Sequence, residues 1–196
     1  MSLLARRLRR ASLNAECIGY PSTRMTLDAA CEHVRTQVNE RVPSGDIDLV
    51  GHSMGGVIAR RLCLSDPAPE VRRVVQIGAP NLGSPLADRL GPLWAVRSAC
   101  GPAIEDLGAV QHRLPIDPRI SAIAGTQSIG RSGGILKGPS DGVVTVRSAW
   151  SGAAHRFAVA QFHTLMPLSS VVARHVIAAL TADRDPALTA PPHRGM

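Results

Sequence analysis

Residues 47–62 read IDLVGHSMGGVIARRL, a largely apolar run followed by a glycine-flanked serine and a helix-like segment. The pattern Gly-x-Ser-x-Gly around Ser53 is typical of a sharp turn from strand to helix, which strains the backbone of the serine and exposes its hydroxyl at the sheet edge. We expect Gly51 and Gly55 to be needed there because a side chain at either position would collide with the neighbouring strand or helix. The N–H of Met54 starts the helix, has no intrahelical acceptor, and can stabilise an oxyanion beside Ser53.

Strand-like and helix-like segments alternate along the rest of the chain. The expected strands span residues 15–18, 47–50, 71–77, 119–124 and 156–161. The expected helices span residues 1–10, 26–42, 54–64 and 168–180, with Thr26 or Ser22 as the cap of the second. This alternation predicts an α/β protein with a mostly parallel sheet flanked by helices. Ligands of such sheets bind where the carboxyl ends of the strands meet.

The length and hydropathy of the chain indicate how many domains it has and whether a segment could cross a membrane. Its 196 residues, 44% of them hydrophobic, predict one domain over residues 1–182 with a proline-rich, disordered tail over residues 183–196. No apolar run approaches the roughly 18–20 residues that cross a membrane. The basic N-terminus lacks the apolar core of a secretory signal. As it stands, the chain is expected to be cytoplasmic.

The charge of the chain is strongly positive but carries little information about nucleic acid. The formal net charge is +7, Lys137 is the only lysine, and the arginines are scattered apart from a cluster within residues 6–10. Because aromatic residues make up only 3% of the chain, few side chains are available to stack on bases. We therefore expect no nucleic-acid partner. Peripheral contact with an anionic lipid surface fits this charge better.

The four cysteines lack the spacing of a metal site or a disulfide framework. They are Cys17, Cys31, Cys63 and Cys100. They are expected to be small buried side chains in a reducing compartment. No cofactor or metal is expected.

A serine nucleophile needs a general base, and the base needs an orienting carboxylate. In this architecture the three residues follow one another in the order Ser, Asp, His. His163 directly follows the last expected strand and is the candidate base. Asp141 follows the fourth expected strand and is the candidate acid, with Gly142 expected to leave room for its carboxylate to reach the imidazole. The sequence thus predicts a triad of Ser53, His163 and Asp141.

Other histidines and aspartates compete for these two roles. His52 is next to the serine, but neighbouring side chains on a turn are expected to point apart, and His155 precedes its strand at the wrong end of the sheet. His112 lies in an irregular segment and is the strongest rival for the base. Asp106 and Asp117 are rivals for the acid, although both precede the fourth strand.

Five motifs together resemble α/β-hydrolases of the lipase and esterase group, notably triacylglycerol-lipase-like bacterial hydrolases. They are GYPS at 19–22, GHSMGG at 51–56, IGAPNLGS at 77–84, SDGVV at 140–144 and FH at 162–163. The resemblance spans residues 3–180 and implies hydrolysis of a small-molecule or lipid ester through the triad named above. It also implies an acyl pocket beside residues 80–84 and a small lid or cap over residues 86–114.

One family feature is missing from this chain. Such lipases carry a His-Gly pair after a strand upstream of the first helix, and that loop supplies a second oxyanion N–H. Here the first expected helix begins essentially at Met1, so strand and motif are both absent. The lost donor is worth about 10²–10³ in turnover. We therefore hypothesise an N-terminally truncated hydrolase, whose upstream codons would encode a strand ending in His-Gly.

The sequence leaves three functions open. The leading one is a serine carboxylic ester hydrolase with an acyl-enzyme intermediate. The second is an acyltransferase, in which an alcohol replaces water in the same triad. The third is a weakly active or non-catalytic protein that keeps the hydrolase fold.

Overall fold

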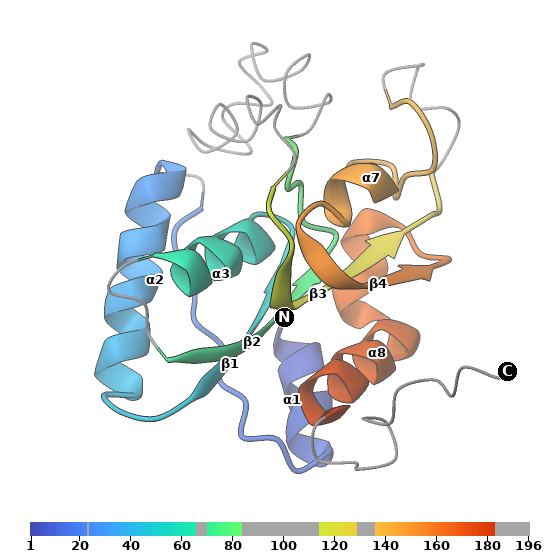
Figure 1. Cartoon of the computed structure of the whole chain (residues 1–196). Helices are drawn as coiled ribbons and strands as arrows, with labels where there is room; N and C mark the ends of the chain where they lie inside the picture. Colours follow the sequence, from blue (N-terminus) through green and yellow to red (C-terminus); the bar gives the residue numbers. More distant parts are fainter. Residues whose placement is uncertain (23, 66–69, 84–113, 129–135, 183–196) are drawn as a thin grey trace, which may run out of the picture.

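Four parallel strands form the sheet of this computed structural model, which describes residues 1–22, 24–65, 70–83, 114–128 and 136–182 (Figure 1). The strands are β1 (Ile47–His52), β2 (Val71–Ile77), β3 (Asp117–Gly125) and β4 (Ala153–Val159). They lie in the spatial order β1-β2-β3-β4, and every neighbouring pair is parallel. The predicted α/β class with a parallel sheet is confirmed.

The central strand β2 shows why the sheet must be covered on both faces. Successive side chains of a strand point to opposite faces. Val74 packs with residues of α3 (Met54–Leu64), whereas Val75 and Ile77 pack with α8 (Ser170–Thr181) on the other face. All three side chains are buried. A parallel strand that reads as an almost continuous apolar run is the expected result.

Helices form a layer on each side of the sheet (Figure 1). On one side, α2 (Leu27–Arg41) packs on α3, and α3 packs on β1 and β2. On the other side, α1 (Ser2–Arg10) packs against α8 and against the 3₁₀ helix η2 (His163–Leu168). A short helix, α7 (Val146–Ala149), joins β3 to β4. These layers leave the carboxyl ends of the strands free for a site.

Several boundaries match their prediction and others do not. α3 and β2 span the predicted residues, and Thr26, not Ser22, caps α2 by accepting a hydrogen bond from the N–H of Ala29 at 3.2 Å. β4 begins three residues and ends two residues earlier than predicted. α8 begins two residues later than the predicted last helix, whose first residue, Leu168, is the last residue of η2.

The strand predicted at residues 15–18 is wrong. This segment has no regular secondary structure and pairs with no strand in the described part of the chain. A strand exists only with a partner to satisfy its backbone groups. The predicted burial of Cys17 is wrong for the same reason, since its side chain is exposed, whereas Cys31 and Cys63 are buried as expected.

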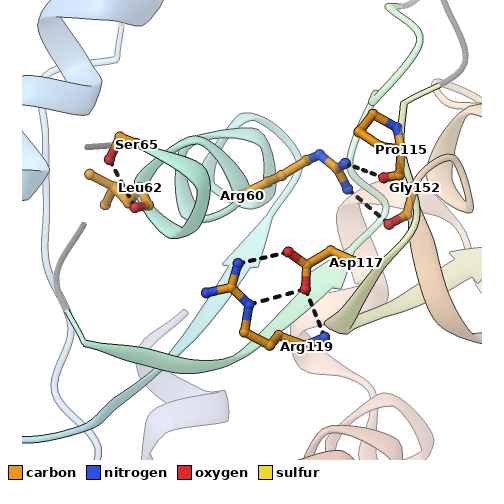
Figure 2. A network of polar contacts seen from close by, with 7 residues as sticks. All are labelled: Arg60, Leu62, Ser65, Pro115, Asp117, Arg119 and Gly152. Carbon is orange, nitrogen blue, oxygen red and sulfur yellow. Dashed lines mark hydrogen bonds and ion pairs between the residues drawn. The ribbon is translucent and has the colours of Figure 1, made fainter. Parts of the chain in front are cut away.

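A buried arginine ties α3 to the amino ends of β3 and β4 (Figure 2). The Arg60 guanidinium is only 4% exposed and donates to the carbonyl oxygens of Pro115 at 2.9 Å and Gly152 at 3.1 Å. A Cβ on Gly152 would lie 2.5 Å from this guanidinium. In the same region Asp117 and Arg119 form an ion pair at 2.7 Å. The polar contacts at the amino ends of β3 and β4 therefore hold α3 and the two strands together.

Two predicted segments fall outside the described residues. They are the tail at 183–196 and the lid or cap at 86–114, of which only Leu114 is described. Among the described helices, none combines the length and the apolar character needed to span a membrane.

Candidate active site

The backbone of Ser53 is strained at the junction of β1 and α3. It has φ +54° and ψ −126°, a positive φ that non-glycine residues rarely adopt. Its N–H donates to the carbonyl of Ile77 at 2.9 Å, which anchors the turn to β2. The predicted sharp turn is therefore present. The serine sits at the carboxyl edge of the sheet, where ligands of parallel sheets bind.

The glycines around this turn differ in what they allow. A Cβ on Gly51 would lie 2.1 Å from the carbonyl oxygen of Gly55, so a side chain at Gly51 is excluded. The same expectation for Gly55 is wrong, because a Cβ there would meet only the Tyr20 hydroxyl at 3.7 Å. Gly56 is the second crowded position, where a Cβ would lie 2.8 Å from that of Ala79. Close packing of α3 on the sheet thus depends on Gly51 and Gly56.

The structure brings the three predicted site residues together. His163 Nε2 lies 3.1 Å from Ser53 Oγ, and His163 Nδ1 lies 2.8 Å from Asp141 Oδ2. A carboxylate only accepts, so Nδ1–H donates to Asp141 and Nε2 is left to accept the serine hydroxyl proton. Asp141 and His163 are both buried. This is the geometry that a nucleophile, a base and an orienting acid require.

Backbone donors hold the carboxylate of Asp141. Its Oδ1 accepts from the N–H of Val143 at 3.0 Å and of Val144 at 2.7 Å, which leaves Oδ2 for the histidine. The Asp141 carbonyl also accepts from the N–H of His163 at 3.0 Å. Gly142 matters for a different reason from the one expected: a Cβ there would touch only Ser128 at 3.9 Å, but its φ of +97° favours glycine.

Two glycines at strand ends make the room for this pair. A Cβ on Gly78, after β2, would lie 3.1 Å from Asp141 Oδ2 and 3.2 Å from His163 Nδ1. A Cβ on Gly125, at the end of β3, would lie 2.7 Å from that of Asp141. Sequence reasoning missed both positions. The signal for them is a glycine at the carboxyl end of each of two adjacent strands.

His52 is a further residue of the site that sequence reasoning did not identify. Its Nε2 lies 3.0 Å from the carbonyl oxygen of His163, and the two imidazole centroids are 4.8 Å apart. Burial, and after it the neighbouring His163, lower the pKa of His52 from its usual 6.5 to about 4. Sequence reasoning gave His52 no part in the site, whereas the structure places it against His163.

The competing residues lie elsewhere or are not described. Asp117 pairs with Arg119 at the amino end of β3, whereas Ser53 lies at the carboxyl end of the sheet. His155 lies within β4. His112 and Asp106 fall outside the described residues. Of the candidates that the structure describes, His163 contacts Ser53 and Asp141 contacts His163.

The first turn of α3 carries the backbone N–H that the sequence indicates as a candidate oxyanion donor. Met54 is the first residue of α3, so its N–H has no acceptor within the helix. The Tyr20 hydroxyl lies beside the same turn, as its 3.7 Å approach to a Cβ on Gly55 indicates. Burial raises the pKa of Tyr20 above its usual 10, so this hydroxyl keeps its proton. In the described ranges, no group of three or more His, Cys, Asp or Glu residues is placed to hold a metal ion.

Comparison with known proteins agrees with this architecture. A family model of the alpha/beta hydrolase fold matches residues 9–97. No curated protein sequence matches the chain. Solved structures of similar fold include lipase BlEst2 from Bacillus licheniformis in its mature form. It is 18% identical with a TM-score of 0.61, and the alignment covers 82% of this chain and 76% of that one.

Two further structures widen the comparison. Phospholipase PlaB from Legionella pneumophila in complex with thio-NAD is 16% identical with a TM-score of 0.58, covering 76% of this chain and 39% of that one. The mouse alpha/beta hydrolase domain-containing protein 10 is 12% identical with a TM-score of 0.59, covering 95% and 83%. The chain thus spans less than half the length of PlaB. At these identities the likeness shows the fold. The family-model match over residues 9–97 and the likeness to these structures therefore show that the chain has the α/β-hydrolase fold.

Proposed function

We propose that this protein hydrolyses carboxylic esters, with Ser53 as nucleophile, His163 as general base and Asp141 as the residue that orients the base. The observation that carries the proposal is the continuous path from Ser53 Oγ to His163 Nε2, 3.1 Å, and from His163 Nδ1 to Asp141 Oδ2, 2.8 Å. The strained turn at Ser53 supports it, because such turns hold a nucleophile clear of the sheet.

The reaction follows from these positions. His163 Nε2 takes the hydroxyl proton while Ser53 Oγ bonds to the ester carbonyl carbon, and the N–H of Met54 holds the oxyanion. The oxyanion collapses, the C–O bond to the alcohol breaks, and His163 gives its proton to the leaving alkoxide. Water then loses a proton to His163 and attacks the acyl-enzyme. Cleavage of the Ser53 ester returns the proton to Ser53 Oγ and releases the acid.

Lipid esters are the substrate class that the comparisons favour. The structures of similar fold include a lipase and a phospholipase, both at under 20% identity. Exposed apolar side chains follow the base, with Leu165 and Leu168 exposed by 46% and 52%. An exposed apolar surface suits an acyl chain better than a charged substrate.

The test compares wild type with Ser53→Ala on p-nitrophenyl esters of increasing acyl length, together with labelling by a fluorophosphonate probe. Ser65→Ala is the matched control, because Ser65 caps the far end of α3 by donating to the carbonyl of Leu62 at 2.9 Å. We expect Ser53→Ala to lower turnover by at least about 10³-fold and to abolish labelling. Ser65→Ala should retain both.

Other outcomes separate the alternatives. Turnover equal in wild type and Ser53→Ala would contradict the proposal. Ser53-dependent labelling with ester formation in the presence of an alcohol, at the expense of free acid, would indicate acyl transfer. Folded wild type without Ser53-dependent labelling would indicate a non-catalytic protein.

A further inference from the structure

The residue before the nucleophile contacts the residue that we propose as the base. His52 and His163 are 111 positions apart in the sequence, and the described structure joins them by a hydrogen bond and by ring contact. The hydrogen bond runs from the His52 ring to the backbone of His163, and the imidazole planes are tilted by 43°. The strand that carries the nucleophile therefore also touches the base directly.

The partner of this hydrogen bond identifies the tautomer of His52. A backbone carbonyl only accepts, so the nitrogen 3.0 Å from the His163 oxygen must carry the proton. His52 is thus a neutral imidazole with its proton on Nε2. The charged groups that act on it are His163, Asp141 and the N-terminal ammonium group. Its lowered pKa, about 4, keeps it neutral at physiological pH, so it places no positive charge beside His163.

His163 is held from both sides of its own peptide. Its N–H donates to the carbonyl of Asp141 at 3.0 Å, and its carbonyl accepts from His52 at 3.0 Å. Its ring is held by the Asp141 carboxylate at Nδ1 and is in contact with the His52 ring. With both peptide groups and the ring fixed, His163 Nε2 stays 3.1 Å from Ser53 Oγ.

We propose that His52 is a positioning residue of the triad, which holds the His163 backbone and packs against its imidazole so that Nε2 stays on the serine hydroxyl. The proposal rests on the proposed function, since positioning matters only if His163 acts as the base. His52 itself takes no proton from substrate or serine. Small displacements of a base from its nucleophile cost about 10²-fold in rate.

Two substitutions separate the hydrogen bond from the ring. His52→Gln keeps an N–H donor at about the reach of Nε2, whereas His52→Phe keeps the ring and removes the donor. His175→Phe is the matched control, because His175 also contacts an aromatic ring, that of Phe157 at 5.0 Å, but lies in α8 away from Ser53. Each variant is first checked by thermal unfolding, and rates are divided by the fluorophosphonate-titrated concentration.

The kinetic prediction is a loss in kcat rather than in KM. We expect His52→Phe to lower kcat about 10- to 100-fold with KM within about two-fold of wild type. His52→Gln should recover most of kcat, and His175→Phe should match wild type. A purely structural His52 would lower stability without lowering kcat per titrated site, and that result would overturn the proposal.

A second measurement does not depend on turnover. In protein labelled with ¹⁵N-histidine, we expect His52 to be the neutral Nε2–H tautomer at pH 7. We expect the Nδ1–H proton of His163 to exchange with water faster in His52→Phe than in wild type or His52→Gln. A His52 protonated on Nδ1 instead, or equal exchange in all three proteins, would overturn the positioning role. If wild type shows no Ser53-dependent turnover, the proposed function is wrong, and the exchange measurement still decides whether His52 holds His163.

Discussion

Ser53 combines a strained backbone conformation with a hydroxyl that contacts His163. A non-glycine residue with φ +54° and ψ −126° carries a strain of about 1–3 kcal/mol, which the surrounding contacts must offset. Those contacts are its N–H bond to the Ile77 carbonyl and the close approach of Gly51 to Gly55. The strain is a consequence of placing the hydroxyl above the sheet edge, within reach of His163.

Gly78 gives a prediction at this scale. Gly78→Ala adds a methyl group 3.1 Å from Asp141 Oδ2 and 3.2 Å from His163 Nδ1, at a φ of +57°. Gly45→Ala is the control, because Gly45 has φ +96° with nothing within 4 Å of its Cβ position. We expect both variants to lose about 1–2 kcal/mol of stability from the positive φ. Only Gly78→Ala should also lower kcat, by about ten-fold or more, because it displaces the acid–base pair. Equal kcat in the two variants would show that the pair tolerates the methyl group.

His52 predicts a dependence of stability on pH. Its pKa is about 4 in the folded protein and 6.5 in the unfolded chain, so between these values the unfolded chain binds more protons. The contribution of neutral His52 to the free energy of unfolding is therefore fully present above pH 6.5. It is lost as the pH falls to 4, by up to about 3 kcal/mol. Urea unfolding at pH 7, 5.5 and 4.5 should show this loss in wild type and a smaller one in His52→Gln. Parallel curves for the two proteins would mean that His52 titrates normally.

At the scale of elements, α3 contributes both to the candidate site and to the packing of the opposite end of the sheet. Its first turn presents the N–H of Met54 beside Ser53, and its second turn carries Arg60, whose side chain reaches the amino ends of β3 and β4. The helix therefore connects the carboxyl ends of the strands, where Ser53 lies, to the amino ends of β3 and β4. Its close approach to the sheet is allowed by Gly56, which lies against Ala79.

Arg60 supplies the prediction for this element. Arg60→Met removes the donors to the carbonyls of Pro115 and Gly152, and an unpaired buried carbonyl costs about 1–3 kcal/mol. Arg61→Met is the matched control, since the adjacent Arg61 forms an exposed ion pair with Asp28, worth at most about 1 kcal/mol. Denaturant unfolding should show a clearly larger loss for Arg60→Met. An equal loss would mean that the buried guanidinium adds no more than a surface pair.

At the scale of the whole molecule, the described sheet has two edge strands and two central strands. In the described part of the chain, β1 pairs with β2 alone and β4 pairs with β3 alone, whereas β2 and β3 are paired on both sides. Ser53, the proposed nucleophile, therefore directly follows an edge strand of the described sheet. Unlike β2, with five of its seven residues buried, β1 has mostly half-buried residues.

Hydrogen exchange tests this arrangement. Along a parallel edge strand, successive N–H groups point alternately toward and away from the partner. We expect about half of the β1 amides to exchange rapidly, and the amides of β2 and β3 to exchange slowly and together. Uniformly slow exchange along β1 would mean that another segment pairs with its outer edge.

Local signals in the sequence determined most of the elements and the chemistry of the site. The strand, glycines and serine of residues 47–56 specify the turn, because a side chain at Gly51 would collide with Gly55 and α3 begins directly after Ser53. β2 and α3 have their predicted bounds because apolar period and flanking breakers are local properties. The chain order Ser, Asp, His pointed to the three residues that the structure brings together, because topology orders the loops at one sheet edge.

Tertiary packing alone decided the remainder. Residues 15–18 have strand-like composition but no strand beside them, and Gly78, not Gly142, makes the room for the acid and base. His52 lies against His163 although 111 residues separate them in the chain. A local pattern encodes which conformation a segment prefers. Which distant side chains then meet depends on how the separate elements pack, and that is a property of the folded whole.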